Sequence, residues 1–276
     1  MLMRRIRDTP ESTQAARSTE ARLPRRPSGR LIRAVTLDCW GTLFLDGPGS
    51  DERYKRQRLA GMRAGLAGVG IAVTPAQLER AYAASGRWLG SLWQVTRDVS
   101  VREHVVALLE AVDPALSDRL SDEPMAALIR AYASPALIAP PAIDQGARVA
   151  LETLVAEGVV LAVVSNTMRT PGEVVRHVLD QAGLLPLFQV LTFSDECRIR
   201  KPAPAIFRRT LADLGVPPED AVHVGDDPIL DVEGARDAGM RVIQATPDGR
   251  ATAPVKPDAV IRHLGELPAV LGRLGR

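Results

Sequence analysis

The sequence has few cysteines and no long apolar run, and each absence excludes a class of protein. Two cysteines in 276 residues are too few for a disulfide framework, and no His/Cys grouping has the spacing of a zinc site. No apolar stretch approaches the roughly 18 residues needed to span a bilayer, and the N-terminus lacks the apolar region of a signal peptide. We therefore expect a cytoplasmic protein with reduced thiols and no membrane partner.

Positive charge is concentrated at the N-terminus. Residues 1–30 carry eight arginines against three acidic residues, a formal charge of +5, which leaves −3 for the rest of a chain whose total is +2. This segment lacks hydrophobic periodicity and is rich in Ser, Thr and Pro, so we expect a disordered basic tail. No aromatic residue lies among its arginines to stack on bases, which argues against a nucleic-acid partner. Docking to another anionic partner stays open beside a plain solvated extension.

From Leu31 onward, short β-rich runs alternate with amphipathic helical stretches. This alternation indicates βαβ units and predicts an α/β fold with a doubly wound parallel sheet, whose functional edge lies at the carboxyl ends of the strands. The expected strands are 31–37, 159–164, 188–192, 221–224, 240–244 and 259–261, and the expected helices are 145–157, 172–182, 204–214, 230–238 and 264–271.

One block breaks the alternation. It reads as successive helices at 52–68, 75–95, 101–112 and 115–133, with Gly47-Pro48-Gly49 before them and Ala139-Pro140-Pro141 after them. We predict an all-helical domain over residues 46–141, inserted into an α/β core domain of residues 31–45 and 142–276. Trp88 and Trp93 are expected in the core of the helical domain.

Polar residues follow the predicted strands at the edge where a crevice would form. They include Asp38, Ser165, Asp226, Asp231 and Lys201, which is one of three lysines among 35 basic residues. Alone, each is explained by turn or capping chemistry or by solvation. Together, the carboxylates would repel one another at substantial cost without a cation. An all-oxygen site of this kind points to bound Mg²⁺.

These residues fall in four motifs, in the order Asp38-Cys39-Trp40-Gly41-Thr42-Leu43, Val164-Ser165-Asn166, Arg200-Lys201-Pro202 and Gly225-Asp226-Asp227 with Asp231 after it. The motifs resemble those of the haloacid dehalogenase superfamily of hydrolases, which is dominated by Mg²⁺-dependent phosphatases. The resemblance covers about residues 31–276. It implies that the helical block is a cap inserted after the first motif, and such caps often meet one another in homodimers.

The resemblance assigns roles to individual residues. Asp38 is implied as the nucleophile that forms an aspartyl-phosphate, with Ser165 holding a phosphoryl oxygen and Lys201 neutralising charge. The implied metal ligands are Asp38, the backbone carbonyl of Trp40, Asp226 and, directly or through water, Asp231. The implied substrate contacts are Cys39, Trp40, Thr42 and Asn166, partly through backbone N–H groups, and we expect the Cys39 side chain to pack away from Asp38.

Trp40 departs from the family pattern. Most phosphatases of this family carry an aspartate there, two residues after the nucleophile, which protonates the leaving group and later activates water. An indole cannot do acid–base work near neutral pH, and the loss of a general acid typically costs about 10²–10⁴ in rate.

Three interpretations of Trp40 stay open. In the first, the chain is a phosphohydrolase of a small phosphorylated metabolite. Its substrate then has a good leaving group or supplies its own acid, or the enzyme uses another acid such as Asp46. Alternatively, it cleaves a 2-haloacid, because carbon–halogen cleavage needs no leaving-group protonation and dehalogenases of the family carry an aromatic residue there. In the third interpretation, it binds a phosphorylated ligand with little turnover.

Overall fold

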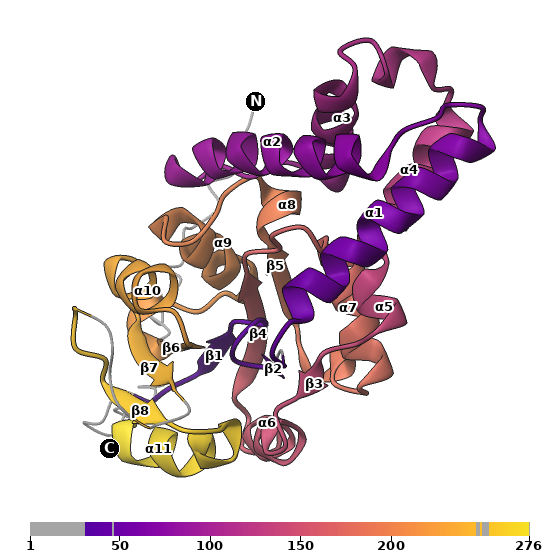
Figure 1. The fold of residues 1–276 in the computed structure, drawn as a ribbon. Helices are drawn as coiled ribbons and strands as arrows, with labels where there is room; N and C mark the ends of the chain where they lie inside the picture. The colour runs from indigo at the N-terminus through magenta and orange to yellow at the C-terminus, as the bar shows by residue number, and fades with distance from the viewer. Residues whose placement is uncertain (1–30, 46, 247–248, 250–253, 276) are drawn as a thin grey trace, which may run out of the picture.

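The computed structural model describes residues 31–45, 47–246, 249 and 254–275. The predicted basic tail, residues 1–30, and Asp46 lie outside the described residues. Six parallel strands form one sheet in the order β5-β4-β1-β6-β7-β8, which confirms the predicted doubly wound α/β core (Figure 1). The strands are β1 (Ala34–Leu37), β4 (Val160–Ser165), β5 (Val190–Phe193), β6 (Ala221–Gly225), β7 (Arg241–Ala245) and β8 (Ala259–Ile261).

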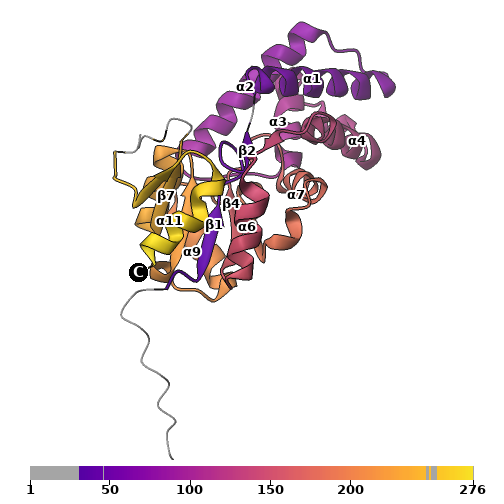
Figure 2. The same ribbon diagram turned by 90° about the horizontal axis from the view of Figure 1, so that it is seen from below.

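Helices cover both faces of the sheet because side chains alternate along each strand. In β1, Val35 and Leu37 enter a core cluster with α6, α7 and α11, whereas Ala34 joins a second cluster with α9 and α10. Figure 2 shows the two layers from below. The bounds of these helices are α6 (Ala147–Ala156), α7 (Gly172–Gln181), α9 (Pro204–Leu214), α10 (Gly234–Asp237) and α11 (Leu267–Leu274).

The other large group of helices comes between two short strands in the sequence, β2 (Phe44–Leu45) and β3 (Ala142–Ile143), which pair antiparallel. We call this group the helical insertion; it has a hydrophobic core of its own. Gly65 allows α1 and α4 to pack closely, because a Cβ there would lie 2.7 Å from the Leu128 side chain. Its helices are α1 (Ser50–Gly68), α2 (Pro75–Gln94), α3 (Val101–Val112), α4 (Asp122–Ala133) and α5 (Pro135–Ile138).

Three local predictions were wrong. The helix expected over 115–133 is interrupted, because a 3₁₀ turn at Ser117–Arg119 precedes α4. Pro124 lies in the first turn of α4, where proline is tolerated, whereas it would break the interior of one continuous helix. The helix expected over 230–238 is a π-helical turn, Pro228–Glu233, followed by the short α10. Neither tryptophan joins the core of the insertion: Trp88 is 39% exposed on α2, and Trp93 is half-buried with its ring against the Arg200 guanidinium.

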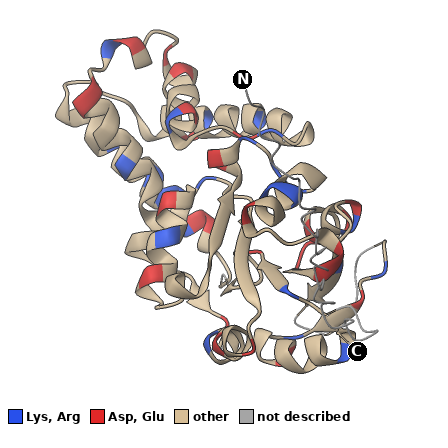
Figure 3. Cartoon of the chain, turned by 180° about the vertical axis from the view of Figure 1, so that it is seen from behind, with Lys and Arg blue, Asp and Glu red and all other residues tan. Residues whose placement is uncertain are grey.

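Charged residues lie mainly on the helices and loops, and the central strands are mostly uncharged (Figure 3). Among the described residues, no helix is both long and apolar enough to cross a membrane.

Candidate active site

Three polar side chains meet where neighbouring strands end. Asp38 follows β1, Ser165 is the last residue of β4, and Asp226 follows β6. Since β1 lies between β4 and β6 and all three run parallel, these residues share one edge of the sheet. Strands β4 and β5 lie on one side of β1, and β6, β7 and β8 lie on the other. In α/β sheets, ligands bind at the point where the strand order reverses in this way.

Lys201 reaches this edge from the loop before α9. Its Nζ lies 2.8 Å from Asp38 Oδ1 and 2.6 Å from Asp231 Oδ1, and the side chain is buried. Although burial acts in the opposite direction, the two carboxylates raise the pKa of Lys201 above its usual value. The Lys201 side chain therefore favours its charged ammonium form, which lies beside Asp38.

Both oxygens of Asp231 already accept hydrogen bonds from the protein. Oδ1 lies 2.6 Å from Lys201 Nζ and 2.9 Å from His223 Nε2, and Oδ2 accepts from the Asp227 N–H at 3.0 Å. Against the effect of burial, Lys201 and His223 hold the pKa of Asp231 well below its usual range. This arrangement suits a residue that orients Lys201 better than one that coordinates a metal directly.

His223 was not singled out by the sequence. It is fully buried in β6, and its Nδ1 lies 2.8 Å from Thr36 Oγ1 in β1. Its ring also stands edge-on to Phe207, with centroids 4.9 Å apart. In the sequence, His223 is marked only as a polar residue within an otherwise apolar strand. That pattern does not identify Asp231 as its partner.

Three carboxylates form a cluster that fits a cation. Asp38, Asp226 and Asp231 each offer an oxygen, and the three oxygens lie within 4.8 Å of one another. Burial and the negative charges of Asp38 and Asp231 raise the pKa of Asp226 to about 7. Gly41 leaves room for this cluster, because a Cβ there would lie 2.3 Å from Asp226 Oδ2 and the φ of +79° favours glycine. The carboxylate oxygens of Asp38 and Asp226 are of the kind that Mg²⁺ prefers, and ligation by the Trp40 carbonyl stays a prediction.

The same edge offers hydrogen-bond donors to an anion. Ser165 is fully buried, and its Oγ has no hydrogen-bond partner among the described residues. The backbone N–H groups of Cys39 and Trp40 come directly after Asp38, and among the described residues neither donates to another backbone group outside the helices and strands. Buried donors without partners are costly, so this set favours a bound oxyanion beside Asp38.

The other residues expected to contact substrate are placed differently. The Asn166 side chain accepts from the Lys201 N–H at 3.0 Å and donates to the Lys201 carbonyl at 3.2 Å, so it positions the lysine loop. The Cys39 side chain packs in the core cluster, as expected. Thr42 is buried, and its hydroxyl has no partner among the described residues. Contact of Cys39 or Asn166 with a substrate stays a prediction and would come through the backbone.

Trp40 is half-buried, two residues after Asp38. Its ring stands edge-on to Phe44, with centroids 5.3 Å apart, and packs against the main core cluster. Its Nε1 is buried and has no acceptor among the described residues. The indole is thus a packing group with a free donor, and it supplies no acid for a leaving group.

Asp195 lies in the short helix α8 (Ser194–Cys197) after β5 and does not join the carboxylate cluster. It is buried and accepts from the Gly172 N–H at 3.2 Å. Burial raises its pKa to about 6, against the lowering effect of that hydrogen bond. Its ionised form is therefore unfavourable in the folded protein.

We expect Asp195→Asn to be more stable than the wild type at pH 8, by roughly 1–2 kcal/mol. The raised folded-state pKa means that Asp195 favours folding below its unfolded pKa and loses that contribution as the pH rises through about 6. The advantage of the variant should therefore shrink between pH 7 and pH 5. Urea denaturation of both proteins at pH 8, 6 and 5 measures it, and a difference independent of pH would contradict the assignment.

A doubly wound sheet with a carboxylate cluster at the edge where its central strands end is the arrangement expected of a hydrolase. A family model described as haloacid dehalogenase-like hydrolase matches residues 32–239. The chain is 30% identical over 253 residues to haloacid dehalogenase-like hydrolase domain-containing protein 3 of Danio rerio, an alignment that covers 87% of this chain and 96% of the relative. The chain belongs to the haloacid dehalogenase-like hydrolase family.

Relatives with named activities fall in more than one class. The phosphoglycolate phosphatase of Pseudomonas putida is 26% identical, with 88% of this chain and 80% of the relative aligned. The phosphoserine phosphatase of Thermus thermophilus is 39% identical over 37% of this chain and 39% of its own length. Among solved structures, a 2-haloacid dehalogenase from Pseudomonas syringae matches with a TM-score of 0.66 and 27% identity, covering 88% of this chain and 99% of that chain.

Proposed function

We propose that this hydrolase is a Mg²⁺-dependent phosphohydrolase of a small phosphorylated metabolite, acting through an aspartyl-phosphate on Asp38. One observation carries the proposal: Asp38 lies between a buried lysine ammonium, a second carboxylate with a raised pKa, and a buried hydroxyl without a partner. This combination suits a dianionic phosphoryl group and the cation that it brings. The similarity to two phosphatases supports the same substrate class.

In this proposal, each residue has a defined task. An Asp38 carboxylate oxygen attacks phosphorus, the bond to the leaving oxygen breaks, and water then cleaves the aspartyl-phosphate to release inorganic phosphate. Lys201 neutralises charge on Asp38 and on the transferred group, while Ser165 and backbone N–H groups hold phosphoryl oxygens. Bound Mg²⁺ would reduce the repulsion between the two anions. Asp231 orients Lys201.

We also propose that the helical insertion, residues 46–141, acts as a cap domain that excludes water and selects the substrate. The chain enters the insertion after β2 and leaves it before β3, and these two strands pair with each other. Both connections to the core therefore pass through one short two-stranded ladder. A homodimer stays a prediction for this chain.

A second candidate is the hydrolysis of a 2-haloacid. The similarity to a 2-haloacid dehalogenase and the aromatic residue at position 40 favour it. In that reaction Asp38 would displace halide from carbon and form an ester, which needs neither a metal nor a general acid. Asp226 argues against it, because its carboxylate clusters with those of Asp38 and Asp231, an arrangement that suits a reaction with a bound cation.

Phosphate release from a panel of acyl, aryl and alkyl phosphates, with Mg²⁺ and with EDTA, tests the proposal. We expect Mg²⁺-dependent release that is faster for acyl and aryl phosphates, because their leaving groups depart without protonation. A parallel incubation with a short 2-haloacid in EDTA should yield no halide.

Two other results of these incubations would each indicate a different function. Halide release in EDTA would replace the phosphohydrolase with a dehalogenase. No release of either product, combined with a rise in Tm on adding a phosphorylated ligand, would indicate a binding protein.

A further inference from the structure

The helical insertion touches the core beside the active site through a polar joint. The loop between α2 and α3 runs antiparallel to the loop that leads to Lys201: the Arg200 N–H donates to the Thr96 carbonyl at 2.9 Å, and the Asp98 N–H donates to the Arg198 carbonyl at 3.3 Å. This contact lies far from the β2–β3 pair in the sequence. It is therefore an attachment between insertion and core in addition to that pair, and Arg58 and Arg169 make another.

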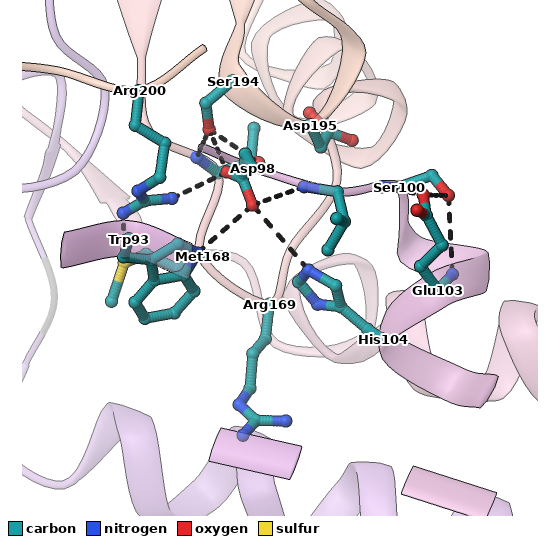
Figure 4. A network of polar contacts seen from close by, with 12 residues as sticks. Trp93, Asp98, Ser100, Glu103, His104, Met168, Arg169, Ser194, Asp195 and Arg200 are labelled. Carbon is teal, nitrogen blue, oxygen red and sulfur yellow. Dashed lines mark hydrogen bonds and ion pairs between the residues drawn. The ribbon is translucent and has the colours of Figure 1, made fainter. Parts of the chain in front are cut away.

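One carboxylate occupies the centre of this joint (Figure 4). Asp98 Oδ2 accepts from Ser194 Oγ at 2.5 Å and from Arg200 Nη1 at 2.7 Å. Oδ1 accepts from the Val99 N–H at 2.9 Å and from Trp93 Nε1 at 3.2 Å. The side chain of Asp98 is 0% exposed and that of Arg200 is 4% exposed, so the pair is isolated from water.

The partners of Asp98 are adjacent to the catalytic loops. Arg200 directly precedes Lys201 in the chain, and its guanidinium also stacks on Trp93 at 4.3 Å from the ring centroid. Ser194 accepts from the Thr167 N–H at 3.0 Å, two residues after Ser165. A single carboxylate from the insertion thus reaches the loop of Ser165 and the loop of Lys201 at once.

We propose that Asp98 is a positioning residue that fixes the Ser165 loop and the Lys201 loop relative to each other from the helical insertion. Asp98 does not touch the carboxylate cluster itself. It acts through Ser194 and Thr167 on one side and through Arg200 on the other. In this arrangement, docking of the insertion and alignment of the phosphoryl-binding groups are a single event.

The Asp98→Asn substitution separates this role from simple packing. Four groups donate hydrogen bonds to Asp98, and His104 Nε2 lies 4.0 Å from its Oδ1, so an amide NH₂ in either orientation leaves at least one N–H donor without an acceptor. Asp113→Asn is the matched control, because Asp113 lies in the same insertion and pairs with Arg119 at the surface.

The kinetic test rests on the proposed phosphohydrolase activity. For Asp98→Asn we expect kcat to fall by on the order of 10–100-fold, with acetyl phosphate and an aryl phosphate affected equally and KM changed less than about threefold. Asp113→Asn should stay within about twofold of the wild type. Unequal losses for the two donors would assign Asp98 to substrate selection and overturn the proposal.

A double variant distinguishes positioning from stability. Asp98→Asn leaves Arg200 buried without its counterion, so Tm should fall by on the order of 10 °C. Adding Arg200→Gln removes the unpaired charge, and we expect Tm to recover in part while kcat stays low. Recovery of kcat together with Tm would show that Asp98 only stabilises the fold, against the proposal.

Amide hydrogen exchange tests the joint without any turnover. In Asp98→Asn, the N–H groups of Thr167, Arg200 and Lys201 should exchange at least about tenfold faster, while those of β8 stay unchanged. If the wild type hydrolyses no phosphate donor, the proposed function fails and this measurement alone decides the inference. Unchanged exchange at these three amides would overturn the role of Asp98.

Discussion

Asp38→Asn is expected to abolish Mg²⁺-dependent phosphate release, with a loss on the order of 10⁴-fold or more. An amide cannot attack phosphorus to form the aspartyl-phosphate, and it removes one of the charges that would hold the cation. The measurement is phosphate release from an aryl phosphate at saturating Mg²⁺. Unchanged activity would remove Asp38 as the nucleophile.

The same variant should fold at least as well as the wild type. Burial raises the pKa of Asp38 despite the opposing effect of Lys201, so the substitution removes a carboxylate whose ionisation is disfavoured by burial. Lys201 keeps its ion pair with Asp231 after the substitution. Thermal unfolding in EDTA should therefore give an equal or higher Tm, in line with the trade-off between stability and activity at catalytic sites.

Asp227→Asn provides the matched control for Asp38→Asn. Asp227 caps the π-helical turn by accepting from the Ile229 and Leu230 N–H groups at 2.8 and 2.7 Å. Asparagine caps helices equally well, so stability should change little. Retained turnover would localise the requirement for a carboxylate to Asp38, whereas a large loss would place Asp227 at the metal.

The sequence was sufficient to predict which strand ends meet. Asp38, Ser165 and Asp226 follow apolar runs, and parallel strands place such residues at one edge whatever the details of packing. The site could be anticipated because it depends on topology. The catalytic roles of these residues stay predictions.

The sequence did not predict how the site is braced. Asp98 and Arg200 are 102 positions apart, and their contact depends on how the insertion docks on the core. The contact between His223 and Asp231 spans eight positions, but it requires the π-helical turn, which no periodicity rule indicates. Such contacts arise from tertiary packing, on which local patterns carry no information.

Trp40→Asp is expected to increase the hydrolysis of alkyl phosphates by up to about 10²-fold in kcat/KM, with only a few-fold change for aryl and acyl phosphates. A carboxyl group at position 40 would stand near Asp38 and Asp226, whose charges raise its pKa and keep a proton available for the leaving oxygen. Only a poor leaving group needs that proton. The expected gain is therefore selective for alkyl esters.

Trp40→Asn is the control that removes the indole without supplying an acid. Both substitutions lose the packing of the ring against Phe44 and should cost a similar amount of stability, about 2–4 kcal/mol by urea denaturation. If Trp40→Asn matches Trp40→Asp on alkyl phosphates, the gain comes from space rather than from acid catalysis. Equal changes on alkyl and aryl phosphates would likewise contradict the interpretation that Trp40 marks a missing acid. A gain confined to Trp40→Asp on alkyl esters would show that the rest of the site is competent and that Trp40 restricts it to substrates with good leaving groups.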